Sequence, residues 1–170
     1  MVCWLAQMSV QRVCMGSHPI LRQKAQPVET FSQSLRRLAS DLLDTMYANQ
    51  GVGIAAPQVG YSLQIFIANP SQERGEELIV INPVLEKAIG RTSITEGCLS
   101  IPGIWKPIKR AKHICMRGQD IRGKSFVIDA EGLLAVVLQH EFDHLQGRLF
   151  IDRLSWLQRR ALASAPSRLE

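Results

Sequence analysis

Long hydrophobic runs and cysteine-rich segments are both missing from the sequence, and each absence excludes a class of protein. No apolar stretch approaches the roughly 20 residues of a membrane-spanning helix. The start of the chain also lacks the basic region of a secretory signal peptide. Only four cysteines occur in 170 residues, without the spacing of a disulfide framework. We therefore expect a cytoplasmic protein with reduced cysteines and no membrane insertion.

Clusters of basic residues, internal repeats and low-complexity segments are missing too. The 20 lysines and arginines exceed the 15 acidic residues, but they are scattered along the chain. This scatter argues against sequence-specific binding of nucleic acid. A chain of 170 residues can bury a hydrophobic core large enough for stability without disulfide bonds. We therefore predict a single domain that spans residues 1–170.

Apolar residues recur at helical spacing in two stretches. The first covers residues 34–48, with Ser34 as the expected N-cap. The second covers residues 132–145, contains no proline and precedes Gly147, a plausible stop. A last short helix is expected at residues 155–163.

Other segments favour short strands. Residues 63–68 and 77–83 are rich in β-branched and aromatic side chains. Further candidates are residues 84–89, 108–116 and 125–129, the last after a hairpin turn at residues 120–124. Irregular structure is expected before residue 33 and at residues 51–60 and 148–154. The pattern predicts an α+β fold, in which short, mostly antiparallel strands pack around a central metal-binding helix.

The helix predicted at residues 132–145 carries the pattern H-E-x-x-H. His140 and His144 lie four residues apart, so they share one helix face and can bind one metal ion. Glu141 lies about 100° around the helix and can reach a metal-bound water without being a ligand. The pattern alone is loose, and an amphipathic helix can carry two histidines by chance.

A catalytic metal site of this kind needs a third protein ligand. Only two carboxylates follow His144, so we expect this ligand upstream. Cys98 is the candidate, because Gly97 before it lets the backbone bend close to a metal. The alternative is a small buried cysteine, which is the usual role of a free cysteine. We assign that role to Cys3, Cys14 and Cys115.

Residues 51–60 match the G-x-G-x-x-A pattern of dinucleotide-binding sites. That interpretation fails, because a helix precedes the pattern and because Pro57 and Gly60 oppose a helix after it. We expect instead a loop whose bare backbone approaches the metal site, with Gln58 pointing inward as an amide donor. A plain turn between helix and strand is the alternative.

Three stretches together resemble the signature motifs of the peptide deformylase family, in the family's order. They are residues 51–60 (GVGIAAPQVG), 96–100 (EGCLS) and 139–145 (QHEFDHL). Residues 19–22 and 149–152 are also similar to that family, so the resemblance extends from about residue 19 to residue 155. The compact spacing of the first two motifs resembles the type found in Gram-negative bacteria and organelles.

This resemblance implies a metal-dependent hydrolase that removes the formyl group from the N-terminal methionine of nascent polypeptides. The implied cofactor is Fe²⁺, for which Ni²⁺, Co²⁺ or Zn²⁺ can substitute. The implied partners are formylated nascent chains, with association with the ribosome as a further expectation. The implied location is the bacterial cytoplasm or an organelle. The implied metal ligands are Cys98, His140 and His144.

The resemblance also implies roles in catalysis. Glu141 would be the acid/base, and Gln58 with the backbone N–H of Leu99 would stabilise the reacting oxygen. The chain departs from the family's pattern at residues 104–106, which flank the site. Its tail after residue 155 is short for a ribosome-docking helix.

The metal-binding helix also predicts the origin of substrate selectivity. Leu133, Val136 and Val137 share its face with the two histidines and can line an apolar slot beside the metal. Such a slot suits an unbranched methionine side chain, although these residues could also be ordinary core. From the loop at residues 51–60, the residues expected to contact the substrate are Val52, Gly53 and Ile54.

Two other functions stay open on the residues alone. A binding protein with a structural metal would need no base at residue 141 and no open coordination position. A metallopeptidase would need a cleft for residues on both sides of a peptide bond.

Overall fold

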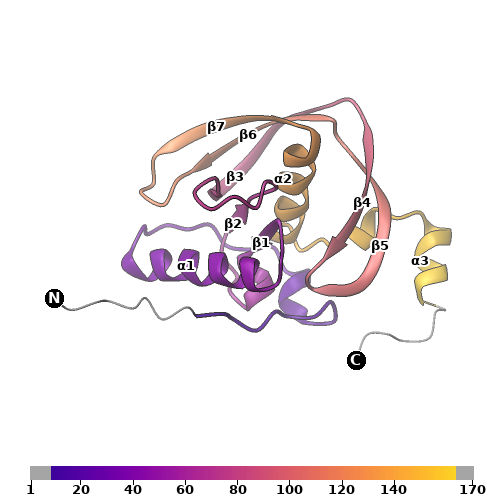
Figure 1. Cartoon of the computed structure of the whole chain (residues 1–170), viewed down its shortest axis with the longest axis horizontal. Helices are drawn as coiled ribbons and strands as arrows, with labels where there is room; N and C mark the ends of the chain where they lie inside the picture. The colour runs from indigo at the N-terminus through magenta and orange to yellow at the C-terminus, as the bar shows by residue number, and fades with distance from the viewer. Residues whose placement is uncertain (1–8, 164–170) are drawn as a thin grey trace.

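The computed structural model describes residues 9–163 (Figure 1). Cys3 lies outside these residues. Within them, no helix is both long and apolar enough to cross a membrane. The helices are α1 (Gln33–Ala48), α2 (Gly132–Leu145) and α3 (Trp156–Ala163), with short 3₁₀ helices η1 (Pro19–Arg22), η2 (Ala56–Val59) and η3 (Phe150–Arg153).

Seven strands form two sheets in the described chain. Five of them are ordered β1-β2-β3-β6-β7, and β4 and β5 form a separate two-stranded sheet. All neighbouring strands are antiparallel, which confirms the predicted α+β class. The strands are β1 (Gly53–Ala55), β2 (Ile65–Ala68), β3 (Leu78–Ile89), β4 (Thr92–Cys98), β5 (Ile101–Arg110), β6 (His113–Gln119) and β7 (Ser125–Glu131).

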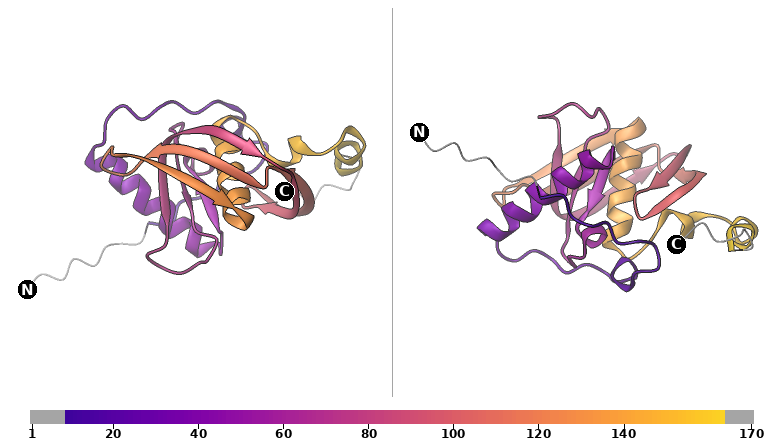
Figure 2. Two further views of the ribbon diagram at one scale, coloured as in Figure 1. Left: turned by 90° about the horizontal axis from the view of Figure 1, so that it is seen from above. Right: turned by 60° about the horizontal axis from the view of Figure 1, so that its bottom comes forward.

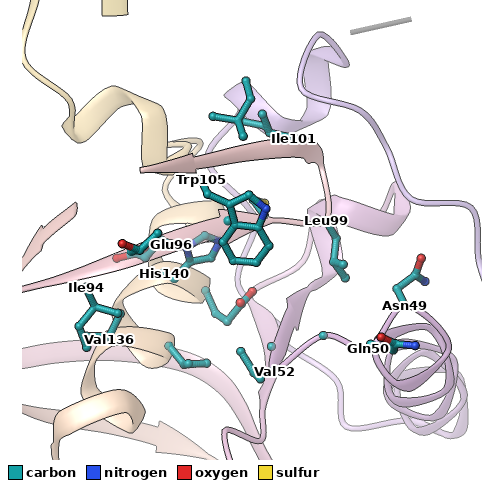
Figure 3. Close-up of a pocket in the computed structure, with 18 of the residues that line it drawn as sticks. Asn49, Gln50, Val52, Ile94, Glu96, Leu99, Ile101, Trp105, Val136 and His140 are labelled. Atoms are coloured by element: carbon teal, nitrogen blue, oxygen red, sulfur yellow. Dashed lines mark hydrogen bonds and ion pairs between the residues drawn. The ribbon is translucent and has the colours of Figure 1, made fainter. Parts of the chain in front are cut away.

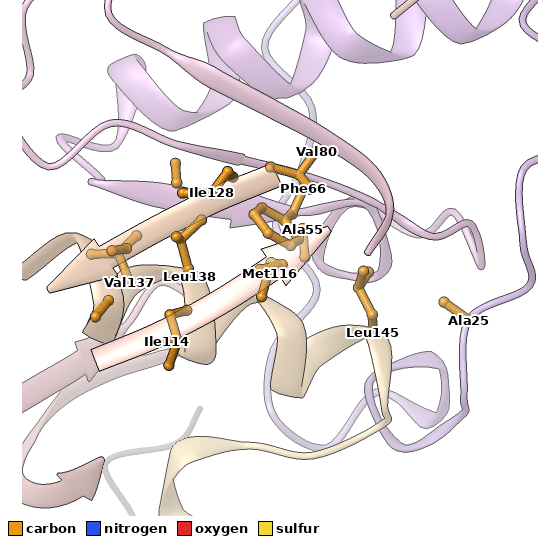
Figure 4. Packing of buried hydrophobic residues seen from close by; sticks show 13 residues of the cluster. Ala25, Ala55, Phe66, Val80, Ile114, Met116, Ile128, Val137, Leu138 and Leu145 are labelled. Atoms are coloured by element: carbon orange, nitrogen blue, oxygen red, sulfur yellow. The ribbon is translucent and has the colours of Figure 1, made fainter. Parts of the chain in front are cut away.

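Helix α2 occupies the centre of the fold. Figures 1 and 2 place it between the five-stranded sheet and the β4–β5 hairpin. Its Leu138 is fully buried and packs in one cluster with Phe66 of β2 and Met116 of β6 (Figure 4). Burying a side chain of this size contributes about 1.5–3 kcal/mol. The packing therefore fixes which face of α2 remains available to the hairpin.

Both ends of α2 depend on glycine. Gly132 begins the helix with φ +62°, and Gly147 follows it with φ +69°. A Cβ on Gly147 would lie only 2.8 Å from the backbone of Arg22, so a larger residue would displace the segment around η1. The predicted range of this helix and its stop at Gly147 are confirmed.

Helix α1 covers the part of the sheet formed by β1 and β2. Its fully buried Leu42 and Met46 pack in one cluster with Ile54 and Ile65. The predicted N-cap was wrong by two residues. Ser32 has extended backbone angles, and its side chain accepts a hydrogen bond from the N–H of Leu35.

The β4–β5 hairpin is the main feature that the sequence patterns did not predict. The strand expected at residues 108–116 is wrong, because β5 ends at Arg110 and β6 begins at His113. Pro102, Gly103 and Pro107 disfavour a strand by local propensity, but both strands of a two-stranded sheet are edge strands, where proline is tolerated. The loop expected at residues 51–60 instead contains β1 and η2, where Pro57 occupies the first turn.

The two strands expected at residues 77–83 and 84–89 are one strand, β3. Asn82 interrupts its pairing with β6 and has φ 49°, a conformation that asparagine tolerates. The Asn82 side chain hydrogen-bonds both the N–H and the C=O of Val28, at 2.8 and 2.9 Å. The irregularity therefore ties the N-terminal segment to the sheet.

Candidate metal centre and active site

Cys98, His140 and His144 come together at the junction of β4 and α2. Their possible ligand atoms all lie within 4.8 Å of one another, and Cys98 Sγ is 3.3 Å from His144 Nε2. The two imidazole rings lie one turn apart, with centroids separated by 5.0 Å. One thiol and two imidazoles form a donor set that binds transition metals such as iron, nickel, cobalt and zinc. The three residues therefore fit a divalent cation.

Glu96 holds His140 in the orientation that a ligand requires. Its Oε2 lies 2.8 Å from His140 Nδ1, so Nδ1–H donates to the carboxylate and Nε2 is the nitrogen that would bind a metal. Burial opposes ionisation of Glu96, but hydrogen bonds from Arg110 and His140 outweigh it and lower the pKa of this carboxyl to about 2. Glu96 is therefore a permanent anion beside the site.

The charge of Glu96 belongs to a buried network that the sequence patterns did not reveal. Arg110 has no exposed side-chain surface and donates two hydrogen bonds to Glu96, at 2.7 and 2.8 Å. Its third contact is with Asp143 of α2, which also accepts two 2.6 Å hydrogen bonds from Arg153. Paired arginine–carboxylate contacts are geometrically specific, so the network locks the hairpin against α2.

The charges around the histidines favour a cation. Burial by itself lowers the pKa of His140, but hydrogen bonds with Cys98 and Glu96 and the charge of Glu141 outweigh it and raise the pKa to about 10. The same negative groups would attract a metal ion at this position. Burial lowers the pKa of His144 well below its usual value, so this imidazole is neutral, as a ligand must be.

Glu141 lies beside the ligands and depends on Gly53. It is buried, and burial raises its pKa to about 7. Its Oε2 and His144 Nδ1 are the two buried side-chain polar atoms in the described chain without a hydrogen-bond partner. A Cβ on Gly53 would lie 2.9 Å from Glu141 Cδ, so only glycine leaves room for this carboxylate. This contact explains the second glycine of the first motif.

The side-chain amide of Gln58 also points toward the candidate metal ligands. Its Oε1 accepts a hydrogen bond from the N–H of Ala55 at 2.8 Å, which orients the amide. Its Nε2 then lies 3.6 Å from Cys98 Sγ and 3.3 Å from Ser100 Oγ. Gln58 therefore lies beside Cys98 at the candidate metal centre, and its role as a donor to the reacting oxygen stays a prediction.

A cavity of about 530 Å³ opens beside the three possible ligands (Figure 3). Every predicted substrate contact except Ile54 lines it; Ile54 is instead fully buried against α1. Ile94 of the hairpin also lines it and was not predicted, and Ile104 and Trp105, which were expected only to flank the site, line it too. Their contact with the cavity was not predicted, because no sequence pattern had indicated that the hairpin exists. The predicted residues on its wall are Val52, Gly53, Leu99, Leu133, Val136 and Val137.

Comparisons with known proteins agree with this geometry. The sequence model of the polypeptide deformylase family matches residues 10–160. Peptide deformylase 1 of Clostridium perfringens is 42% identical over 145 residues, which cover 85% of this chain and 98% of that protein. This chain belongs to the peptide deformylase family. Its relatives remove N-terminal formyl groups, so the hydrolase predicted from the three motifs is confirmed.

Solved structures of the family share the fold. The peptide deformylase of Legionella pneumophila is 39% identical, with a TM-score of 0.86 over 92% of this chain and 99% of that chain. The enzyme of Thermus thermophilus is 42% identical, with a TM-score of 0.86 over 92% of each chain. Membership of the family decides against a purely structural metal protein and against a metallopeptidase.

Proposed function

We propose that residues 1–170 form one catalytic domain, an Fe²⁺-dependent peptide deformylase that acts on formyl-methionine at the start of nascent polypeptides. The observation that carries this proposal is the convergence of Cys98, His140 and His144, with Cys98, His140 and Glu141 lining an apolar cavity. These three residues would be the metal ligands. Ni²⁺, Co²⁺ or Zn²⁺ would also suit this donor set. A bound divalent cation supplies Lewis-acid chemistry, which polarises the formyl carbonyl and acidifies water.

The chain's own residues would handle the protons. Glu141 accepts a proton from the attacking water and later delivers it to the departing amine. Its carboxylate is held close to the ligands by burial and by the absence of a side chain on Gly53. No covalent bond between enzyme and substrate is needed.

Two hydrogen-bond donors would stabilise the negative charge that develops on the formyl oxygen. One is the Gln58 amide, which is already oriented by the Ala55 N–H. The other is the backbone N–H of Leu99, at the end of β4 next to Cys98. Donors that are in place before the reaction avoid the cost of reorganising during it.

The methionine side chain would enter a slot on α2. We call this the α2 slot and define it as the cavity wall formed by Leu133, Val136 and Val137. Val52 lines the cavity as well, while Gly53 keeps the backbone of β1 close to Glu141. A narrow apolar slot favours an unbranched side chain, which agrees with selection of methionine.

We further propose that the enzyme acts in the cytoplasm, or in an organelle, on chains leaving the ribosome. The family's relation to newly made polypeptides supports this location. Helix α3 is short for a ribosome-docking helix, but it stands apart from α2 and the five-stranded sheet (Figure 1), and we expect it to be the segment that approaches the ribosome. Its Trp156 and Leu157 are 62% and 70% exposed.

A combined metal and activity measurement tests the proposal. Protein purified anaerobically is analysed for metal and assayed for formate release from formyl-Met-Ala-Ser, with acetyl-Met-Ala-Ser as the control. We expect about one iron per chain and release from the formylated peptide alone. Formate release that persists after complete removal of the metal would refute a metal-dependent mechanism.

A further inference from the structure

Trp105 is the largest apolar side chain among the residues that line the cavity, and the reaction proposed above does not use it. It lies on β5 and is 67% exposed. Most of its surface therefore contributes nothing to the packing of the fold. An exposed apolar side chain that lines a ligand cavity is available to contact the ligand. The neighbouring lining residues Leu99 and Ile104 are also apolar.

The position of the indole depends on Gly97 of β4. A Cβ on Gly97 would lie 2.9 to 3.0 Å from three carbons of the six-membered ring, so the ring presents its face to this glycine. Glycine within a strand often marks a close approach to the backbone. Here that close approach places the indole beside Cys98, at the mouth of the cavity. Figure 3 draws Trp105 on the same side of the cavity as His140, with Val136 and Val52 on the opposite side.

The direction of the substrate follows from the proposed function. The formyl group lies at the metal ligands, and the methionine side chain lies in the α2 slot. Successive side chains of an extended peptide point to opposite sides of its backbone. The side chain after methionine therefore points away from the α2 slot. In Figure 3, Trp105 lies across the cavity from Val136 of the α2 slot, on the side to which this side chain would point.

We propose that Trp105 determines specificity at the residue directly after formyl-methionine, where it favours large apolar or aromatic side chains. This inference rests on the proposed function, because the orientation of the peptide depends on it. An aromatic side chain gains an offset or edge-to-face contact with the indole, in addition to burial of apolar area. A short polar or acidic side chain at the same position gains neither.

The test compares kcat/KM for formyl-Met-X-Ser peptides in which X is Phe, Leu, Ser or Asp. We expect the wild type to prefer Phe over Ser by roughly 3- to 10-fold, the scale of one aromatic contact. Trp105→Ala should lower this ratio to about 1, and the loss should appear in KM because the contact is present in the ground state. Trp105→Phe should retain part of the preference, since it keeps a ring.

Trp156→Ala is the matched control, because Trp156 is similarly exposed but lies on α3 outside the cavity. It should keep the wild-type ratio. A wild type without preference at X, or a ratio that Trp105→Ala leaves unchanged, would overturn the inference. So would a preference found only in formyl-Met-Ser-X peptides, which would place the contact at the third residue. If the wild type hydrolysed none of these peptides, the proposed function would fail and the inference with it.

Discussion

Replacing Arg110 with methionine tests the buried network that holds the active site together. Methionine keeps much of the side-chain volume but removes the charge between Glu96 and Asp143. These two carboxylates are 6% and 4% exposed, so water cannot replace the lost partner. Removing one member of a buried ion pair costs about 3–5 kcal/mol, because it leaves an uncompensated buried charge. Asp143 keeps Arg153, so most of the cost arises at Glu96.

This loss is large compared with the total stability of a typical protein, about 5–15 kcal/mol. For a chain of this size, 1 kcal/mol shifts the melting temperature by roughly 2–4 °C, so we expect a decrease of roughly 6–20 °C. The free energy of unfolding is measured by urea denaturation followed by circular dichroism. Wild type and variant are compared at equal metal content, because a bound metal stabilises the folded state.

Arg117→Met is the matched control. Arg117 pairs with Glu86 at 2.7 Å, but the two side chains are 52% and 37% exposed. A pair of this kind contributes about 0–1 kcal/mol. If Arg110→Met and Arg117→Met cost the same within about 1 kcal/mol, the argument from burial is wrong.

The same variant should also weaken metal binding. Glu96 orients His140, and Arg110 holds Glu96 with two hydrogen bonds. Loss of a group that orients a ligand typically lowers metal affinity about 10- to 100-fold. Competition with a chromophoric chelator measures this change without reference to activity. An unchanged affinity would show that Glu96 keeps its position without Arg110.

Three further substitutions test the residue roles. Cys98→Ala should lose most of the bound metal, whereas Cys115→Ala should keep it; full retention in Cys98→Ala would contradict the ligand assignment. Glu141→Gln should retain metal and fold while kcat falls at least ~10²-fold, the usual scale for loss of a general base, so near-normal turnover of the metal-loaded variant would refute the role. Val137→Phe should raise KM for formyl-methionine peptides at unchanged metal content, because the ring fills the α2 slot. An unaltered KM would place the methionine side chain elsewhere.

Local patterns in the sequence were sufficient to predict α2 and the groups that it carries. Helical periodicity depends on residues three and four positions apart, so the shared face of His140 and His144 can be derived without a structure. The offset of Glu141 follows from the same geometry. Cys98 required one further step, elimination of the other possible ligands.

Contacts between distant segments were decided by tertiary structure alone. Glu96 and His140 are 44 positions apart, and Arg110 and Asp143 are 33 apart. No local periodicity relates such residues, because their distance depends on how the hairpin packs against α2. Only one feature of the sequence could have indicated this network, namely the carboxylate of Glu96 two positions before the candidate ligand Cys98.

The β4–β5 hairpin shows why local propensity was insufficient at the edge of the site. Its glycines and prolines favour turns in isolation, but antiparallel pairing, packing on η3 and polar contacts with α2 override that preference. Trp105 meets Gly97 only because this pairing places them side by side. The sequence by itself determined the chemical groups of the centre and their spacing on one helix. The tertiary structure determined the partners that orient these groups and the wall that faces the substrate, since both depend on contacts between segments far apart in the chain.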